Sequence, residues 1–147
     1  MVMLDMQIPC IPPKATSQMK GACRTSSGVR FFKKANVAAA EQNLLSLVRA
    51  EMPAEWKTIE AGPVELQVLF VWPWRKSEPM RERINGAKHM DVKPDCSNII
   101  KMLEDCLTRL NVWRDDSQVA CLRVVKLWGD KPGISIRVMK IEQPKGE

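Results

Sequence analysis

The sequence has few of the features that zinc sites, membrane spans and secretion signals require. It contains a single histidine, His89, and five cysteines without a CxxC pair, which does not fit a zinc framework. No apolar run approaches the ~20 residues that span a bilayer, and the N-terminus lacks the basic and continuous apolar segments of a signal peptide. We expect a cytoplasmic protein with reduced cysteines. Cys106 and Cys121 lie in apolar patterns, which predicts that both belong to the core.

Acidic residues are absent between Met6 and Ala40. The basic residues of this segment are Lys14, Lys20, Arg24, Arg30, Lys33 and Lys34. A second basic segment begins at Arg75 and Lys76 and is diluted by several acids, and the net charge is +6. A segregated positive field favours a polyanion such as nucleic acid. The alternative is an ordinary solvated surface, and charge alone does not decide between the two.

The length of 147 residues predicts one domain, 1–147, with a core of its own. Periodicity predicts strands at 1–11, 63–72, 118–128 and 134–141 and helices at 34–51 and 97–110, with Asn36 a candidate cap of the first helix. The order β-α-β-α-β-β is typical of an α+β fold with a small mixed sheet and two main helices on one face. Segments 12–33 and 73–94 read as basic loops, the second with a short helix near 80–84, and 143–147 as a frayed tail.

Acidic residues flank the second predicted helix. Asp91 and Asp95 precede it, and Asp115 and Asp116 follow it. Clustered carboxylates favour a hard cation such as Mg²⁺, which can support phosphodiester cleavage. On the helix itself, Asn98, Lys101 and Asp105 can share the polar side, and the lysine would offset charge that develops on a phosphate.

Each of these residues also has a purely structural explanation. Asp95 and Ser97 are good N-cap residues, Asp115 and Asp116 suit a polar turn, and Lys101 with Asp105 suits an exposed ion pair. There is a geometric objection to a shared metal site as well. If the next strand folds back along the helix, the two groups of acids lie at opposite ends of it. The path of that strand or a second subunit could remove this objection, and the sequence does not say which.

Several motifs of the chain resemble the RusA family of Holliday junction resolvases, which are common in prophages. KPDCSNIIK is similar to the family pattern K/R-P/x-D-x-D-N-x-x-K, and RDDSQV to W-x-D-D-x-Q-V. The helix MLEDCLTRLNVW and the strand CLRVVKLW also match, and IPPK with GVRFFKK resembles the basic loop before the first helix. The resemblance is clearest from Lys93 to Lys140.

The resemblance implies a dimeric, Mg²⁺-dependent crossover junction endodeoxyribonuclease that nicks four-way DNA junctions symmetrically in recombination or repair. Mn²⁺ is a possible substitute for Mg²⁺. Carried over by position, Asp95 is the first acid, Asn98 the asparagine, Lys101 the lysine and Asp116 the late acid. The basic residues would hold DNA backbone phosphates. Trp72 and Trp74 could stack on unpaired bases, although we expect at least one of them to pack against the sheet edge instead.

The chain departs from the family pattern at Ser97, where a second aspartate is usual. A neutral hydroxyl is a weak Mg²⁺ ligand, although it could hold a metal-bound water or cap the helix. Asp91 or Asp105 could supply the missing carboxylate. Alternatively, the protein binds branched DNA with little or no cleavage. A third possibility is an unrelated RNA-binding domain, but the aromatic-rich strand motif of the common RNA-recognition fold is absent.

Overall fold

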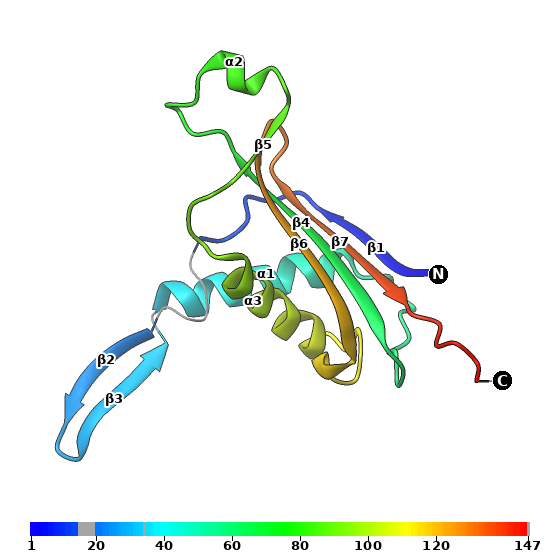
Figure 1. The fold of residues 1–147 in the computed structure, drawn as a ribbon. Helices are drawn as coiled ribbons and strands as arrows, with labels where there is room; N and C mark the ends of the chain where they lie inside the picture. The colour runs from blue at the N-terminus through cyan, green and yellow to red at the C-terminus, as the bar shows by residue number, and fades with distance from the viewer. Residues whose placement is uncertain (15–19, 34, 147) are drawn as a thin grey trace.

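The computed structural model describes residues 1–14, 20–33 and 35–146, with only the backbone for 20–24 and 30–33. A five-stranded sheet in the order β1-β7-β4-β6-β5 forms its centre (Figure 1). Its strands are β1 (Val2–Ile8), β4 (Val64–Pro73), β5 (Ala87–His89), β6 (Val119–Gly129) and β7 (Gly133–Lys140). β4 and β6 are parallel, and the other neighbouring pairs are antiparallel, so the predicted mixed sheet is confirmed.

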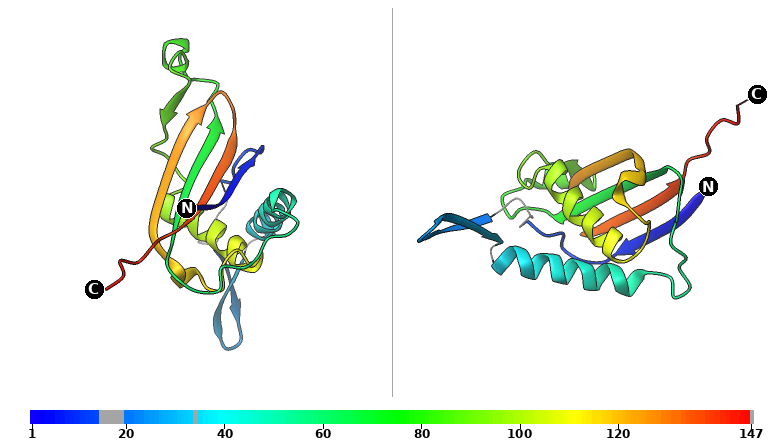
Figure 2. Two further views of the ribbon diagram at one scale, coloured as in Figure 1. Left: turned by 90° about the vertical axis from the view of Figure 1, so that its right-hand side faces the viewer. Right: turned by 90° about the horizontal axis from the view of Figure 1, so that it is seen from below.

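Two long helices, α1 (Ala35–Glu51) and α3 (Cys96–Arg109), cover one face of this sheet, as the sequence predicts. The turned views in Figure 2 show both helices on the same side of the strands. α1 begins at Ala35, so Asn36 lies inside the first turn and is not the cap. Within the described ranges, no helix is both long enough and apolar enough to cross a membrane.

The core lies between the sheet and these helices because alternate strand residues point toward them. β4 alternates strictly between buried and half-buried positions, and Trp72 on its buried side is 0% exposed. Trp72 therefore packs against the sheet, as expected for at least one of the two tryptophans, and its ring is not free to stack on bases. Cys106 is buried as predicted, whereas Cys121 is exposed on the opposite face, where its Sγ donates to Glu65 Oε1 at 3.3 Å. The prediction that Cys121 belongs to the core is wrong. The apolar residues of β6 do not alternate with polar ones, so the sequence pattern does not show which face of the strand is buried.

Both segments that were predicted as basic loops contain secondary structure. The first holds a hairpin of β2 (Lys20–Thr25) and β3 (Gly28–Lys33), whose turn places Gly28 at a φ of 133°. The polar composition of this segment hid a tight TSSG turn between two strands. The second holds the predicted short helix, α2 (Met80–Arg83), together with the unpredicted β5, and it projects from the body in a different direction from the hairpin (Figure 1).

Candidate functional site

Asp95 is the N-cap residue of α3, with extended backbone angles of φ −67° and ψ 146°. Its carbonyl oxygen accepts the first helical hydrogen bonds, from the N–H groups of Asn98 at 3.1 Å and Ile99 at 3.0 Å. Its side chain, however, makes no capping hydrogen bond, and the residue is exposed. The capping explanation therefore does not account for this carboxylate, which remains available to a ligand beside the positive end of the helix.

The segment that leads into Asp95 is fastened to the sheet by Lys126, a residue that sequence analysis missed. Its Nζ donates to the carbonyl oxygens of Val92 at 2.7 Å and Pro94 at 2.6 Å. The carbonyl of Lys126 in turn accepts from the N–H of Met90 at 3.0 Å. The sequence did contain a signal for this role. Lys126 lies two residues before the buried Trp128 on β6 and therefore on the same face of the strand, where a charged group requires polar partners. Lys126 thereby sets the position of the Asp95 backbone.

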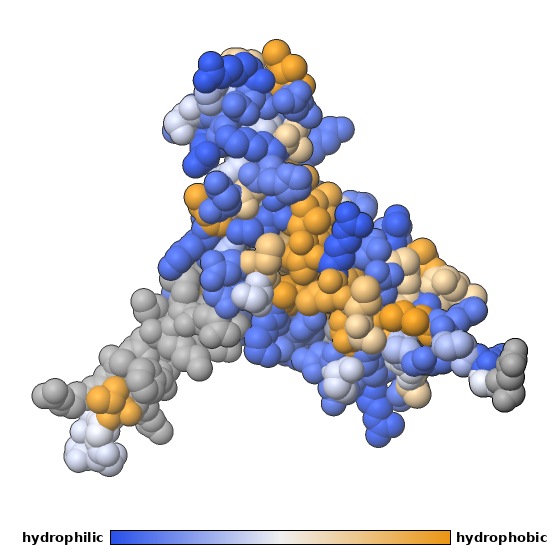
Figure 3. All heavy atoms as spheres, viewed as in Figure 1, coloured by the Kyte–Doolittle hydropathy of each residue, from blue (hydrophilic) through white to orange (hydrophobic). Residues whose placement is uncertain are grey.

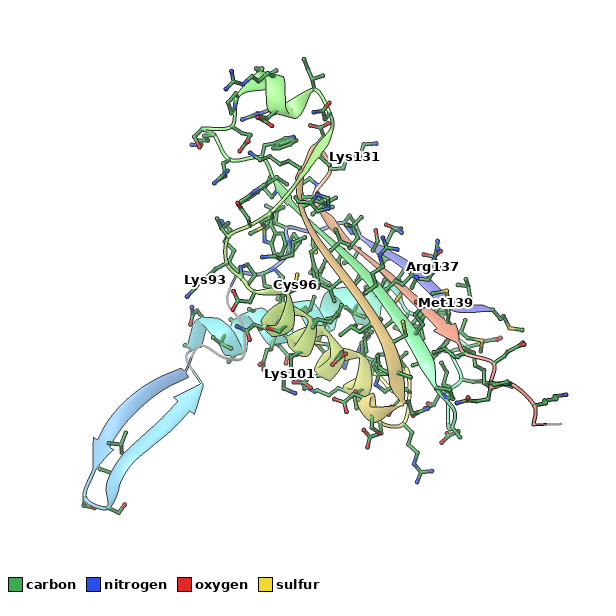
Figure 4. All side chains as sticks on the ribbon, viewed as in Figure 1. Lys93, Cys96, Lys101, Lys131, Arg137 and Met139 are labelled. Carbon is green, nitrogen blue, oxygen red and sulfur yellow. The ribbon has the colours of Figure 1, made fainter. Side chains whose placement is uncertain are left out.

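The other predicted residues of this end lie close by in the chain. Asp91 is exposed on the segment that Lys126 holds, and Ser97 is exposed on the first turn of α3. Asn98 is half-buried on the same turn, and Lys101 is exposed one turn further on. Figure 4 shows Lys101 on the outer side of α3, beyond the labelled Cys96 at its start. We call these residues together the Asp95 end of α3.

The chain reverses sharply after α3 and fixes the position of the second acidic pair. Asn111 has a φ of 57°, the left-handed conformation that commonly ends a helix. Trp113 is fully buried, and its Nε1 donates to Thr108 Oγ1 at 2.8 Å. A parallel bridge joins Trp113 to Ile59. The following residues therefore start from a well-anchored point.

Asp115 has a structural role at this turn. It caps the short helix η1 (Asp116–Gln118), and its Oδ1 accepts from the N–H of Ser117 at 2.9 Å. In return, Gln118 Oε1 accepts from the N–H of Asp115 at 3.0 Å, which completes a capping box. The backbone hydrogen bond from Ser117 lowers the pKa of the Asp115 carboxyl. A polar turn accounts for this residue without a metal.

Asp116 takes no part in that capping box. It is half-buried and lies along a hollow of about 440 Å³, which we call the α3–η1 groove. The charged residues that line the groove are Glu41, Asp105, Arg109, Arg114, Asp115 and Asp116. Asp105 therefore belongs with Asp116, at the far end of α3 from Asp95. We call Asp116 and its neighbours the Asp116 end.

Glu104 is a further acid that sequence analysis passed over. Burial raises the pKa of its carboxyl, and the negative charges of Asp116 and Asp105 raise it further, while Lys101 lowers it. Glu104 therefore experiences the fields of both Asp116 and Lys101. The signal in the sequence was its position three residues after Lys101, on the same side of the helix.

The two ends do not meet within one chain. β6 starts beside the Asp116 end and returns to the segment held by Lys126, and the 14-residue helix α3 is about 21 Å long. Mg²⁺ binds its oxygens at about 2.1 Å, so a single ion does not bridge the two ends of one chain. Over the part of the chain that the structure describes, no group of three His, Cys, Asp or Glu side chains could hold a metal. The geometric objection raised by the sequence is therefore confirmed for one subunit.

The predicted DNA-binding residues fall into three groups. Lys14 and Lys76 are exposed. Arg75 is ion-paired with Glu78 at 3.1 Å and lies over the ring of Trp128. The hairpin carries Lys20, Arg24, Arg30 and Lys33, whose side chains are outside the described part, and Lys34 is outside the described residues altogether.

Comparison with known proteins gives evidence on the family of the chain that is independent of the structure. A family model for the endodeoxyribonuclease RusA matches residues 11–139. The chain belongs to the RusA family. Relatives of this RusA-family chain include a protein of Lactococcus phage r1t named crossover junction endodeoxyribonuclease rusA, which is 24% identical over 86% of the chain and 89% of the phage protein. The uncharacterized protein YqaN of Bacillus subtilis (strain 168) is 31% identical over 58% of the chain, a match that spans 63% of YqaN.

Proposed function

We propose that this protein is a structure-selective endodeoxyribonuclease that resolves four-way DNA junctions by paired phosphodiester nicks. One observation carries the proposal: the carboxylates of Asp95 and Asp116 make no capping hydrogen bond, although a structural role in a cap or turn was the alternative explanation for both residues. The neighbouring Asp115 does cap its helix. Family membership supports the same chemistry, since the match covers both acids.

The donor atoms suit Mg²⁺, with Mn²⁺ as a substitute. Asp95 and Asp116 offer exposed or half-exposed carboxylate oxygens, the ligands that hard cations prefer. Asp91, or Ser97 through a water, completes the set at the Asp95 end. A bound metal ion would activate the attacking water and offset charge on the phosphate. Lys101 contacts the scissile phosphate, and the amide of Asn98 orients the first acid.

The active form in this proposal is a homodimer. Paired nicks require two active sites on one junction, and a single chain keeps Asp95 and Asp116 at opposite ends of α3. A site that takes Asp95 from one subunit and Asp116 from its partner satisfies both requirements. It also explains why neither acid caps a helix within its own chain.

Binding to the junction relies on backbone phosphates. The exposed Lys14 and Lys76, together with the basic residues of the hairpin, supply the positive charge. Such contacts release counterions, so affinity falls steeply with salt and carries little base specificity. The proposal therefore predicts a structure-selective enzyme whose junction binding is salt-sensitive.

The test is a nicking assay on an end-labelled four-way junction, with Mg²⁺ or with a chelator. We expect paired nicks in Mg²⁺ that disappear with chelator and in Asp95→Asn and Asp116→Asn. Tight junction binding without nicks would show a branched-DNA-binding module of the same fold instead. Equal binding to junction and to duplex of the same sequence would contradict both functions.

A further inference from the structure

The segment 74–90, which we call the arm, is an ordered projection. Glu78 at its centre is only 6% exposed. Its Oε1 accepts from Lys88 Nζ at 2.7 Å and its Oε2 from Arg75 Nη2 at 3.1 Å. Arg83 closes the arm by donating to the carbonyl oxygens of Glu78 at 3.2 Å and Arg75 at 2.8 Å. Because both carboxylate oxygens of Glu78 have a donor, this network holds the segment in one conformation.

The base of the arm is attached to the sheet. Trp74 Nε1 donates to Asp130 Oδ1 at 2.8 Å, and the guanidinium of Arg75 lies 5.0 Å from the ring centre of Trp128. β5 pairs with β6, and the arm ends at Met90, whose N–H donates to the carbonyl of Lys126. The same lysine holds the lead-in to Asp95. The arm and the Asp95 end therefore keep a fixed spatial relation.

The tip of the arm presents two large aliphatic side chains to solvent. Met80 is 72% exposed and Ile84 is 82% exposed. They are four residues apart on one helical turn, so they lie on the same side of it. Figure 3 shows hydrophobic residues at the outer end of the arm. Burial of such side chains on binding is favourable, so a rigid arm that exposes two of them is suited to a partner.

The charge around this tip identifies the kind of partner. The arm contains five basic and two acidic residues. Lys76 and Arg81 are exposed, and neither forms an ion pair with another described residue. Apolar side chains beside unpaired cations match DNA whose base faces are accessible between charged backbones, because a wedge of Met or Ile must otherwise unstack a base step before it can insert, which costs free energy. Intact duplex keeps these faces stacked, whereas the branch point of a junction exposes them.

We propose that Met80 and Ile84 pack against the base pairs exposed at the branch point of a four-way junction, while Lys76 and Arg81 contact the flanking phosphates. The arm thus selects branched DNA over duplex. Because the arm is fixed relative to Asp95, it also sets how far from the branch point the strand is cut. This inference rests on the proposed function and extends it to the element that recognises the substrate.

The test uses the full-length protein and a four-way junction with 2-aminopurine beside the branch point, in chelator so that no strand is cut. We expect wild type to raise the fluorescence, because the base next to the probe is unstacked. Met80→Ser combined with Ile84→Ser should lose most of this rise and about tenfold of the preference for junction over duplex, with duplex binding unchanged. The control, Ile11→Ser with Leu122→Ser, removes aliphatic side chains that are 65% and 46% exposed elsewhere and should behave as wild type.

Each other outcome has a distinct meaning. An unchanged fluorescence rise and junction preference in the tip variant would overturn the role of the arm and leave the nuclease proposal intact. A lower molar mass of that variant by light scattering would show that the tip is a subunit contact, which also overturns the inference. If wild type raises fluorescence and prefers junctions but makes no Mg²⁺-dependent nicks, the arm is supported and the nuclease proposal fails. Absence of both responses in wild type overturns the two together.

Discussion

The two ends of α3 use their aspartates differently. At the Asp95 end, a single acid occupies the cap position, makes no capping bond, and is positioned through its backbone by Lys126. At the Asp116 end, two adjacent acids divide the work: Asp115 closes the turn and Asp116 lines the groove. A cap position therefore does not identify a structural acid. The hydrogen bonds of each carboxylate separate Asp115, which has a structural role, from the two acids that we propose as metal ligands.

The strongest test of this difference removes the carboxylate charge of Asp115 and of Asp116 in two separate variants. We expect Asp116→Asn to reduce Mg²⁺-dependent nicking by at least ~100-fold, because even partners behind a metal ligand typically cost about 10- to 100-fold. Asp115→Asn is the matched control. Asparagine caps as well as aspartate, so nicking should stay within about twofold of wild type. Equal losses in the two variants would show that the turn, and not one carboxylate, is what activity requires.

A second prediction concerns the anchoring of the Asp95 end. Lys126→Met leaves the carbonyls of Val92 and Pro94 without their donor, which should cost about 1–3 kcal/mol in the free energy of unfolding. It should also raise the Mg²⁺ concentration for half-maximal nicking about tenfold, with partial recovery in Lys126→Arg. The control is Ile134→Val, a core change that costs about 0.5–1.5 kcal/mol. If that control shifts the Mg²⁺ dependence equally, Lys126 acts only through stability.

A third prediction sharpens the comparison at Ser97. Ser97→Asp adds a carboxylate on the first helical turn, where the helix dipole also favours it. We expect the Mg²⁺ concentration for half-maximal nicking to fall several-fold, while Ser97→Ala leaves it nearly unchanged. The measurement is a Mg²⁺ titration of the junction-nicking rate. A large loss in Ser97→Ala would show that the serine hydroxyl, rather than Asp91, completes the metal site.

The smallest effect is expected at Glu104. Its pKa is raised by burial and by Asp116 and Asp105, so ionisation of Glu104 destabilises the folded state at neutral pH. Below the usual value of 4.5 the protonated group carries no such cost, and stability is lost as the pH rises through the raised pKa. Glu104→Gln should therefore melt slightly higher than wild type at pH 7, with a difference that vanishes near pH 4. Glu55→Gln, an exposed acid, should show no comparable difference in thermal melts.

Much of the fold follows from local patterns in the chain. The β4 alternation and the apolar stripe of α3 predict the mixed sheet and its helical layer, since each pattern demands one buried face. The short helix near 80–84 was predicted, but the hairpin and the fixed position of the arm were missed, because their order comes from a tight turn and from ion pairs such as Lys88 with Glu78. Such contacts leave no periodic signal in the sequence.

The sequence motifs predict which residues form the candidate site, but they do not predict the contacts that each residue makes. The family pattern singled out Asp95, Lys101 and Asp116, but the residues alone gave no physical reason to prefer Asp116 to Asp115, because that difference lies in one backbone hydrogen bond. Lys126 and Glu104 were missed for the same kind of reason. Each acts through neighbours that are distant in sequence or on another turn, and only the folded chain brings them together.

The central claim is that Asp95 and Asp116 act in one nuclease site although a single chain holds them apart. The most direct test mixes Asp95→Asn and Asp116→Asn subunits after unfolding and refolding together, with two affinity tags to isolate the mixed dimers. Each variant alone should be inactive, and the mixed dimer should regain Mg²⁺-dependent nicking at a single strand of the junction, because it contains one intact site. Mixed dimers that bind the junction and cut no strand would contradict a site shared between subunits.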